Sequence, residues 1–139
     1  MAAEQTLVLV KPDAMQRRLA GEIIGRFEAR GLTLRAARLV QVDRELAGEH
    51  YAEHAEKPFF GELVDFITSS PTLALVLEGE GAIAVVRSTM GSTNRATSAP
   101  GTIRGDLALS MPDILVHGSD SPESAAREVK LWFGDDGLV

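Results

Sequence analysis

The run Gln5-Thr6-Leu7-Val8-Leu9-Val10, followed at once by Lys11-Pro12-Asp13, is the stretch from which the fold can first be deduced. Its apolar and β-branched residues are typical of a buried strand. Lys11-Pro12-Asp13 ends that pattern abruptly, as a loop does. The sequence therefore predicts a buried strand over residues 5–10 that leads into a loop.

The next two segments change from helical to strand periodicity. Residues 19–30 carry apolar side chains at helical spacing, and Gly31 is a good C-cap for that helix. Residues 32–42 alternate as a half-buried strand does. The apolar side chains expected on one face of this strand are Leu32, Leu34, Ala36, Val40 and Val42, and Arg38 is the exception on that face.

The rest of the chain continues the alternation of helices and strands. We expect a helix from Asp43 toward Tyr51, a helix over 59–68 and a strand over 72–77. A helix over 82–90 and a functional loop over 91–106 should follow. The chain should end with a strand over 113–116, which stops at His117-Gly118, and a last helix that opens at Ser121-Pro122. Without the extra helices, the order is β-α-β-β-α-β. This order favours an α/β (α+β) ferredoxin-like sandwich, a four-stranded antiparallel sheet covered by helices, over a doubly wound parallel sheet.

Composition limits the class of protein. The chain has 139 residues, is 45% hydrophobic and contains no linker or repeat, so we expect one domain over residues 1–139. It has no cysteine, no secretory signal and no apolar run long enough to span a bilayer, which favours the cytoplasm and no membrane partner. The net charge of −6 repels nucleic acid, so a phosphate site needs local basic residues.

Three familiar motifs can be set aside. Residues 79–84 fit the G-x-G-x-x-A dinucleotide pattern, but no second strand ending in an acidic residue follows, so a simple turn is favoured. His50 and His54 have the spacing of zinc ligands but lack the glutamate and a third ligand, so we interpret them as surface histidines. The chain has no P-loop sequence.

The segment from His117 to Glu123 is more informative. A histidine at a strand end can project toward a cleft, although a single histidine is more often structural. Ser119 offers a hydroxyl nearby, and Ser121 begins a helix whose amides favour negative charge. Glu128 lies at the edge of the apolar stripe of that helix. It is either salt-bridged or a hydrogen-bond acceptor that orients an imidazole.

Three basic residues fall where a phosphate could reach them. Lys11 follows a strand, Arg87 is late in a helix, and Arg104 lies in a glycine-shaped loop over residues 99–106. Arginine binds phosphate bidentately, and small neighbours allow a ligand to approach. Any one of these residues alone is more often a solvated surface charge. Their joint pattern favours a phosphate site.

With these segments identified, the chain resembles the nucleoside diphosphate kinases over essentially its full length. The matching pieces are Val10-Lys11-Pro12-Asp13, Gly21-Glu22-Ile23-Ile24, His50-Tyr51-Ala52-Glu53-His54, Lys57-Pro58-Phe59-Phe60, residues 66–71, residues 100–106 and His117-Gly118-Ser119-Asp120-Ser121. The resemblance implies a ping-pong reaction in which a nucleoside triphosphate, mainly ATP, phosphorylates His117 and a nucleoside diphosphate takes the group. It also implies broad base and sugar specificity.

The resemblance assigns a role to each further residue of the site. Ser119 and Glu128 would orient the histidine, Phe59 would stack on the base, and Met111 would form the other wall of the base slot. Phosphates or sugar would be held by Lys11, Tyr51, Arg87, Thr93 and Arg104. Mg²⁺ would bridge the phosphates and be held more by substrate than by protein side chains. The family forms hexamers or tetramers, so we expect a homo-oligomer.

One position departs from the family. Members usually carry asparagine three residues before the histidine, where it contacts the ribose, whereas this chain has Ile114. The resemblance therefore predicts retained activity with weaker nucleotide binding. Two rivals stay open: a catalytically silent nucleotide-binding paralogue on the same fold, and an oxidoreductase that rests only on the Gly79 turn.

Overall fold

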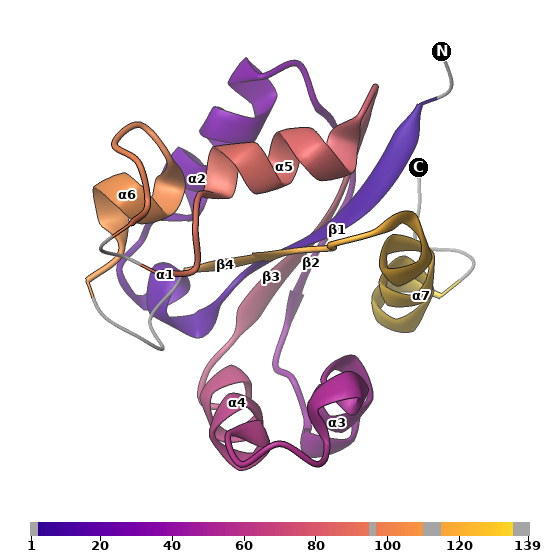
Figure 1. Cartoon of the computed structure of the whole chain (residues 1–139). Coiled ribbons are helices and arrows are strands. Elements are labelled where there is room, and N and C mark those ends of the chain that lie inside the picture. Colours follow the sequence, from indigo (N-terminus) through magenta and orange to yellow (C-terminus); the bar gives the residue numbers. More distant parts are fainter. Residues whose placement is uncertain (1–2, 95–96, 110–114, 135–139) are drawn as a thin grey trace.

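The structure, a computed structural model, describes residues 3–94, 97–109 and 115–134. Four strands and seven α-helices alternate along these residues (Figure 1). Their bounds, in chain order, are β1 Glu4–Val10, α1 Pro12–Gln16, α2 Ala20–Ala29, β2 Thr33–Val40, α3 Arg44–His50, the 3₁₀ turn η1 Ala52–His54, α4 Phe60–Ile67, β3 Thr72–Gly79, α5 Ala82–Met90, α6 Ile103–Leu107, β4 Val116–Gly118 and α7 Pro122–Phe133.

The strands form one sheet in the order β2-β3-β1-β4, and every neighbouring pair is antiparallel. This confirms the ferredoxin-like sandwich and rules out the doubly wound parallel sheet for these strands. The antiparallel pairing also removes the support for the dinucleotide motif, which belongs to a parallel βαβ unit. Residues 79–81 simply turn from β3 into α5, with Gly81 at φ +63°.

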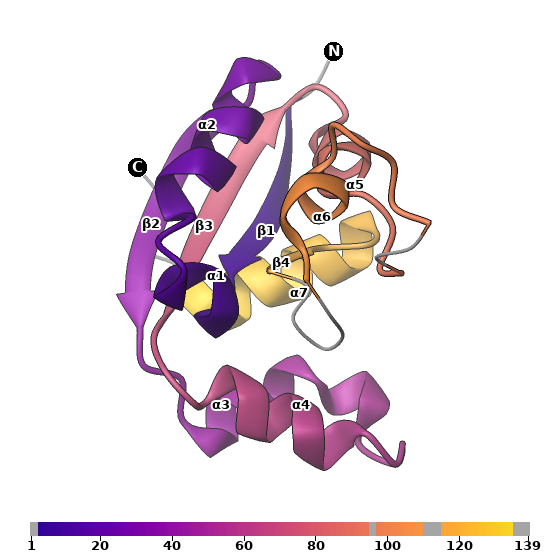
Figure 2. The same cartoon turned by 90° about the vertical axis from the view of Figure 1, so that its left-hand side faces the viewer.

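Helices cover both faces of the sheet (Figures 1 and 2). On one face, apolar residues of α1, α2, α5 and α6 pack against strand side chains such as Val8 and Leu75. On the other face, α3, α4 and α7 pack against the alternate side chains, such as Leu9 and Val76. The central strand β1 is therefore buried on both sides, as its unbroken apolar run predicts. Among the described residues, no helix is long and apolar enough to cross a bilayer.

The prediction that Leu32, Leu34, Ala36, Val40 and Val42 share one face of the second strand was wrong. Pairing between β2 and β3 shifts register between Leu34 and Ala36. A bulge adds a residue to one strand and turns the following side chains to the opposite face. As a result, Leu32 packs in the core beside α2, Ala36 packs in the core beside α3, and Leu34 is exposed.

Three further boundaries differ from the prediction. The residues after β1 form the short helix α1 rather than a loop, because Pro12 starts it and Asp13 lies in its first turn. The predicted loop over 91–106 contains α6, whose first amides are capped by the Thr102 side chain. His117 lies inside β4, opposite Leu9, rather than after the end of a strand. Residues 113 and 114 of the predicted strand lie outside the described residues.

Candidate functional site

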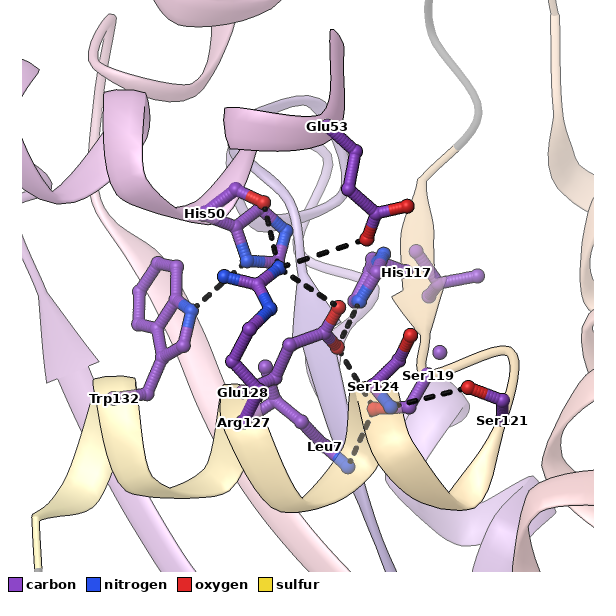
Figure 3. Close-up of polar contacts among 12 residues, drawn as sticks. Leu7, His50, Glu53, His117, Ser119, Ser121, Ser124, Arg127, Glu128 and Trp132 are labelled. Atoms are coloured by element: carbon purple, nitrogen blue, oxygen red, sulfur yellow. Dashed lines mark hydrogen bonds and ion pairs between the residues drawn. The ribbon is translucent and has the colours of Figure 1, made fainter.

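His117 is held by a carboxylate of α7 (Figure 3). Its Nε2 lies 2.8 Å from Oε1 of Glu128, and the same oxygen accepts a hydrogen bond of 2.8 Å from the Ser119 hydroxyl. The Ser119 hydroxyl accepts in turn from the Leu7 amide of β1. Ser119 and Glu128 are buried, whereas the His117 side chain keeps 22% of its surface exposed. The geometry thus fixes one edge of the imidazole and leaves part of the ring accessible.

This network determines which ring nitrogen of His117 is free. Burial acts to raise the pKa of Glu128, but hydrogen bonds from His117 and Ser119 and the charge of Arg127 outweigh it, so the pKa is lowered. An ionised carboxylate only accepts hydrogen bonds, so Nε2 of His117 carries the proton. Nδ1 therefore carries a lone pair.

The electrostatic surroundings keep His117 uncharged. Burial lowers the pKa of His117, and the charges of Lys11 and Arg104 act in the same direction, while Glu128 opposes them. The net shift is downward, away from the ordinary value near neutrality. At neutral pH the imidazole is thus a neutral nucleophile.

Three cations line the cavity beside His117. Lys11, Arg87 and Arg104 contribute to its wall, and its volume is about 250 Å³. Burial and the nearby Arg104 charge lower the pKa of Lys11 to about 8, and burial with the Arg87 charge lowers the pKa of Arg104 to about 10. Lys11 and Arg104 are therefore predominantly cationic at pH 7, and together with Arg87 they create a local positive field in an acidic protein.

Backbone carbonyls fix the two arginines. Arg104 is almost fully buried and donates to the carbonyl oxygens of Gly91 and Val116, at 2.9 and 2.8 Å. Arg87 donates to the carbonyl of Gly118 at 3.1 Å. A Cβ at Gly118 would lie 2.8 Å from a methyl of Val86, so only glycine lets β4 approach α5 this closely. Helix–strand packing therefore sets the position of the cations relative to His117.

The opposite wall is formed by the segment between α3 and α4. Tyr51 lines a second hollow together with His117 and Glu128. Burial and the Glu128 charge raise the pKa of Tyr51 to about 12, so its hydroxyl stays protonated at neutral pH. That hydroxyl is buried and has no hydrogen-bond partner among the described residues. It is a donor without a protein acceptor, which suits a residue that contacts an anionic ligand.

The interpretation of His50 and His54 as surface histidines was wrong for His50. His50 is buried, its ring centroid lies 4.7 Å from that of His117, and its Nδ1 accepts a hydrogen bond from the Trp132 indole. His54 is half-buried and lines the same cavity as His117. Helical spacing placed these residues on a helix, but the packing of α3 against α7 buries the first of them.

His50, His117 and Glu128 also form the one described group of potential metal ligands, with ligand atoms within 4.8 Å of one another. Hydrogen bonds within the protein already engage this group. Glu128 accepts from both His117 and Ser119, and Trp132 occupies one nitrogen of His50. A metal ion at this place would therefore have to displace the hydrogen bonds to Glu128 and to Nδ1 of His50.

The remaining predicted site residues are distributed as follows. Phe59 is 43% exposed, and its ring faces His54 with centroids 5.7 Å apart. Thr93 is exposed and lines the cavity with the three cations. Met111 and Ile114 lie outside the described residues. The structure thus brings Thr93 and the three cations to one cavity with His117, and Tyr51 to the adjoining hollow.

Sequence reasoning missed two residues of the site. Asp120 lines both hollows beside His117. Arg127 of α7 donates to the last two carbonyl oxygens of α3. Asp120 carried a usable signal, since it stands three residues after the histidine in the same segment. Arg127 carried none, because only the tertiary structure brings α7 to the end of α3.

A neutral imidazole with one free nitrogen, set among fixed cations, is the arrangement of a phosphoryl-transfer site, where positioning and charge stabilisation supply most of the catalysis. Comparison with known proteins agrees with this class. The family model described as nucleoside diphosphate kinase matches residues 4–138. The chain is 69% identical to a nucleoside diphosphate kinase of Rubrobacter xylanophilus over 131 residues, which is 94% of this chain and 98% of the relative.

Other relatives agree with this comparison. The nucleoside diphosphate kinase of Bacillus licheniformis is 60% identical over 98% of this chain and 92% of its own length. The solved structure of a halophilic enzyme from Halobacterium salinarum in complex with CDP has a TM-score of 0.96 at 48% identity, and covers 99% of this chain and 92% of that one. The chain therefore belongs to the nucleoside diphosphate kinase family, whose members are phosphotransferases.

Proposed function

We propose that this chain transfers the γ-phosphoryl group of a nucleoside triphosphate, mainly ATP, to a nucleoside diphosphate through a phosphohistidine at His117. The lone pair of Nδ1 attacks the γ-phosphorus, and the bond from phosphorus to the bridging oxygen breaks. The diphosphate leaves with that electron pair, and a second diphosphate reverses the step. The main support for the proposal is the 2.8 Å contact between Nε2 of His117 and Glu128, because it leaves Nδ1 of His117 free.

The cavity residues supply the binding that this reaction needs. In this proposal Lys11, Arg87 and Arg104 neutralise the phosphate oxygens, and the hydroxyls of Tyr51 and Thr93 donate to phosphate or sugar. Their common place around His117 supports the assignment. The charges of Lys11 and Arg104 are buried, where the effective dielectric constant is lower than in water. They therefore stabilise the negative charge of a phosphate more strongly than exposed residues do.

Phe59 is proposed as the platform for the nucleotide base, with Met111 on the other side of the base. The ring of Phe59 is 43% exposed, with the Lys57 ammonium 5.7 Å from its centroid, and every base has a π-face on which such a ring can stack. Stacking discriminates poorly between bases, so broad base specificity follows. The family's ribose contact is missing at Ile114, and we expect nucleotide binding to be weaker for that reason.

Mg²⁺ is proposed as the ion that accompanies the nucleotide. It prefers oxygen ligands and retains several waters. The carboxylates of Asp120 and Glu53 line the hollows beside His117, whereas Glu128 is already engaged by two hydrogen bonds. This donor set fits an ion that would be held mainly by phosphates and water, to which Asp120 and Glu53 would add carboxylate oxygens. When bound, Mg²⁺ would neutralise charge on the phosphoryl oxygens.

We further propose that the chain assembles as a homo-oligomer, a hexamer or a tetramer. Strand β2 is an edge of the sheet, and it exposes Leu34 and Leu39, the latter by 64%. An edge strand that carries exposed apolar side chains is suited to pairing with a second copy. The mass of the particle by light scattering distinguishes the two assemblies. Cytoplasmic location stays a prediction of the sequence.

Incubation with γ-labelled ATP tests the proposed chemistry. The wild-type chain should form a phosphoprotein that is labile in acid and stable in base, and His117→Ala should abolish it. The rival, a catalytically silent paralogue, binds nucleotide without labelling. An unlabelled wild-type chain, or a label that survives in His117→Ala, would contradict the proposal.

A further inference from the structure

The candidate site is assembled from two parts that are distant in the chain. Helix α7 positions His117 through Glu128, whereas residues 51–59, hereafter the 51–59 segment, carry Tyr51 and Phe59. The 51–59 segment follows directly from α3, which packs against α7 through the core on that face of the sheet. Nucleotide binding therefore depends on how the end of α3 is fixed relative to α7.

Arg127 of α7 makes that connection (Figure 3). Its guanidinium donates to the carbonyl oxygen of Glu49 at 3.0 Å and to that of His50 at 3.2 Å. These are the last two residues of α3. The final carbonyls of a helix carry partial negative charge, and a guanidinium with several donors suits them.

The same guanidinium lies between two carboxylates of the site. Its Nη2 is 3.9 Å from an oxygen of Glu53, in the 51–59 segment, and 3.9 Å from Oε2 of Glu128. Glu128 uses its other oxygen, Oε1, for His117. Arg127 thus lies between Glu128, which contacts His117, and Glu53, which belongs to the 51–59 segment.

A second residue of α7, Trp132, also contacts the end of α3. The Trp132 indole N–H donates to Nδ1 of His50 at 3.1 Å, and both groups are buried. The backbone of His50 is therefore held by Arg127 and its side chain by Trp132. Tyr51 follows immediately in the sequence, so these two contacts hold the residue directly before it.

We propose that Arg127 is a positioning residue that anchors the nucleotide-binding 51–59 segment to the helix that orients His117. It acts through the end of α3 and does not touch the reacting atoms. The proposal rests on the proposed function of His117, Tyr51 and Phe59. Because 40% of the Arg127 side chain is exposed, removing it should loosen the segment without unfolding the protein.

The test compares Arg127→Gln with Lys130→Gln in the full-length protein. Lys130 is an exposed residue of α7 and makes no side-chain hydrogen bond to any described residue, so it controls for the lost charge. We expect Arg127→Gln to raise the KM for nucleoside diphosphate by about three- to tenfold with kcat nearly unchanged. Arg127→Lys, which retains a single compact donor, should lie between Gln and wild type.

Amide hydrogen exchange supplies the independent measurement. Amides of the 51–59 segment should exchange faster in Arg127→Gln, while those of β1 and β3 keep wild-type protection. A KM equal to that of Lys130→Gln, or a fall in kcat at unchanged KM, would overturn the anchoring role. Failure of the wild-type chain to form a phosphoenzyme would instead overturn the proposed function, and the exchange result would still test the anchor.

Discussion

The β4–α7 side of the site holds His117 through hydrogen bonds between buried groups, whereas the 51–59 segment presents Phe59 with 43% of its surface exposed. The first side is built on a strand and a long helix that pack into the core. The second consists of a 3₁₀ turn and residues between helices. In the proposed function, the chemistry falls to the buried side and recognition to the more exposed side, as sites on scaffolds commonly divide.

The strongest test of this division is Glu128→Gln. The amide keeps the shape but loses the charge that fixes the proton on Nε2 of His117, so the free nitrogen is no longer defined. We expect kcat to fall by about 10²-fold or more, with a much smaller change in KM. The rate of phosphoenzyme formation under single-turnover conditions measures the effect. An equal change in KM would show that the two sides of the site are not separate.

Phe59→Ala tests the other side. Loss of the stacking surface should raise the KM for nucleotides by about tenfold. This factor corresponds to the lower end of the range of base-stacking energies, because the Phe59 ring is only partly exposed. The rate of phosphoenzyme formation at saturating ATP should stay close to wild type. Phe59→Tyr, which keeps the ring, is the matched control. A large loss of kcat in Phe59→Ala would break the proposed division of roles.

The pH dependence of binding sharpens the role of the buried cation. Lys11 has its pKa lowered to about 8, so it is charged below that pH and neutral above it. The KM for nucleotide should therefore rise as pH increases through about 8. The rise should stay within about one order of magnitude, because Arg104, whose pKa is lowered only to about 10, keeps its charge in this range. In Lys11→Arg the rise should move to higher pH, and an unchanged profile would contradict the assignment.

The smallest expected effect is at Ile114, whose place in the family is held by asparagine. Ile114→Asn should lower the KM for nucleotides by about two- to tenfold, the range of one recovered hydrogen bond of ~0.5–1.5 kcal/mol. Ile114→Leu keeps an apolar side chain and should leave the KM unchanged. Identical constants in all three proteins would show that this position does not contact the ribose.

Local signals predicted most of the elements because they reside in short stretches. Asp43 caps α3 through its side chain, and Ser121 caps α7 in the same way. The unbroken apolar run of β1 indicated burial on both faces. Helix α6 was missed because it has five residues, too few for periodicity, and because it depends on Gly105, where any Cβ would clash with the Ala99 carbonyl.

The sequence by itself determined the order of the four strands and of the longer helices, the family and the phosphohistidine candidate, since these depend on residue types at fixed spacing. Only the tertiary structure decided that His50 is buried beside His117, that Nδ1 is the free nitrogen, and that Arg127 reaches the end of α3. The physical reason is that burial, hydrogen-bond partners and pKa shifts arise from contacts between distant segments. The periodicity of one segment does not indicate which other segment will pack against it.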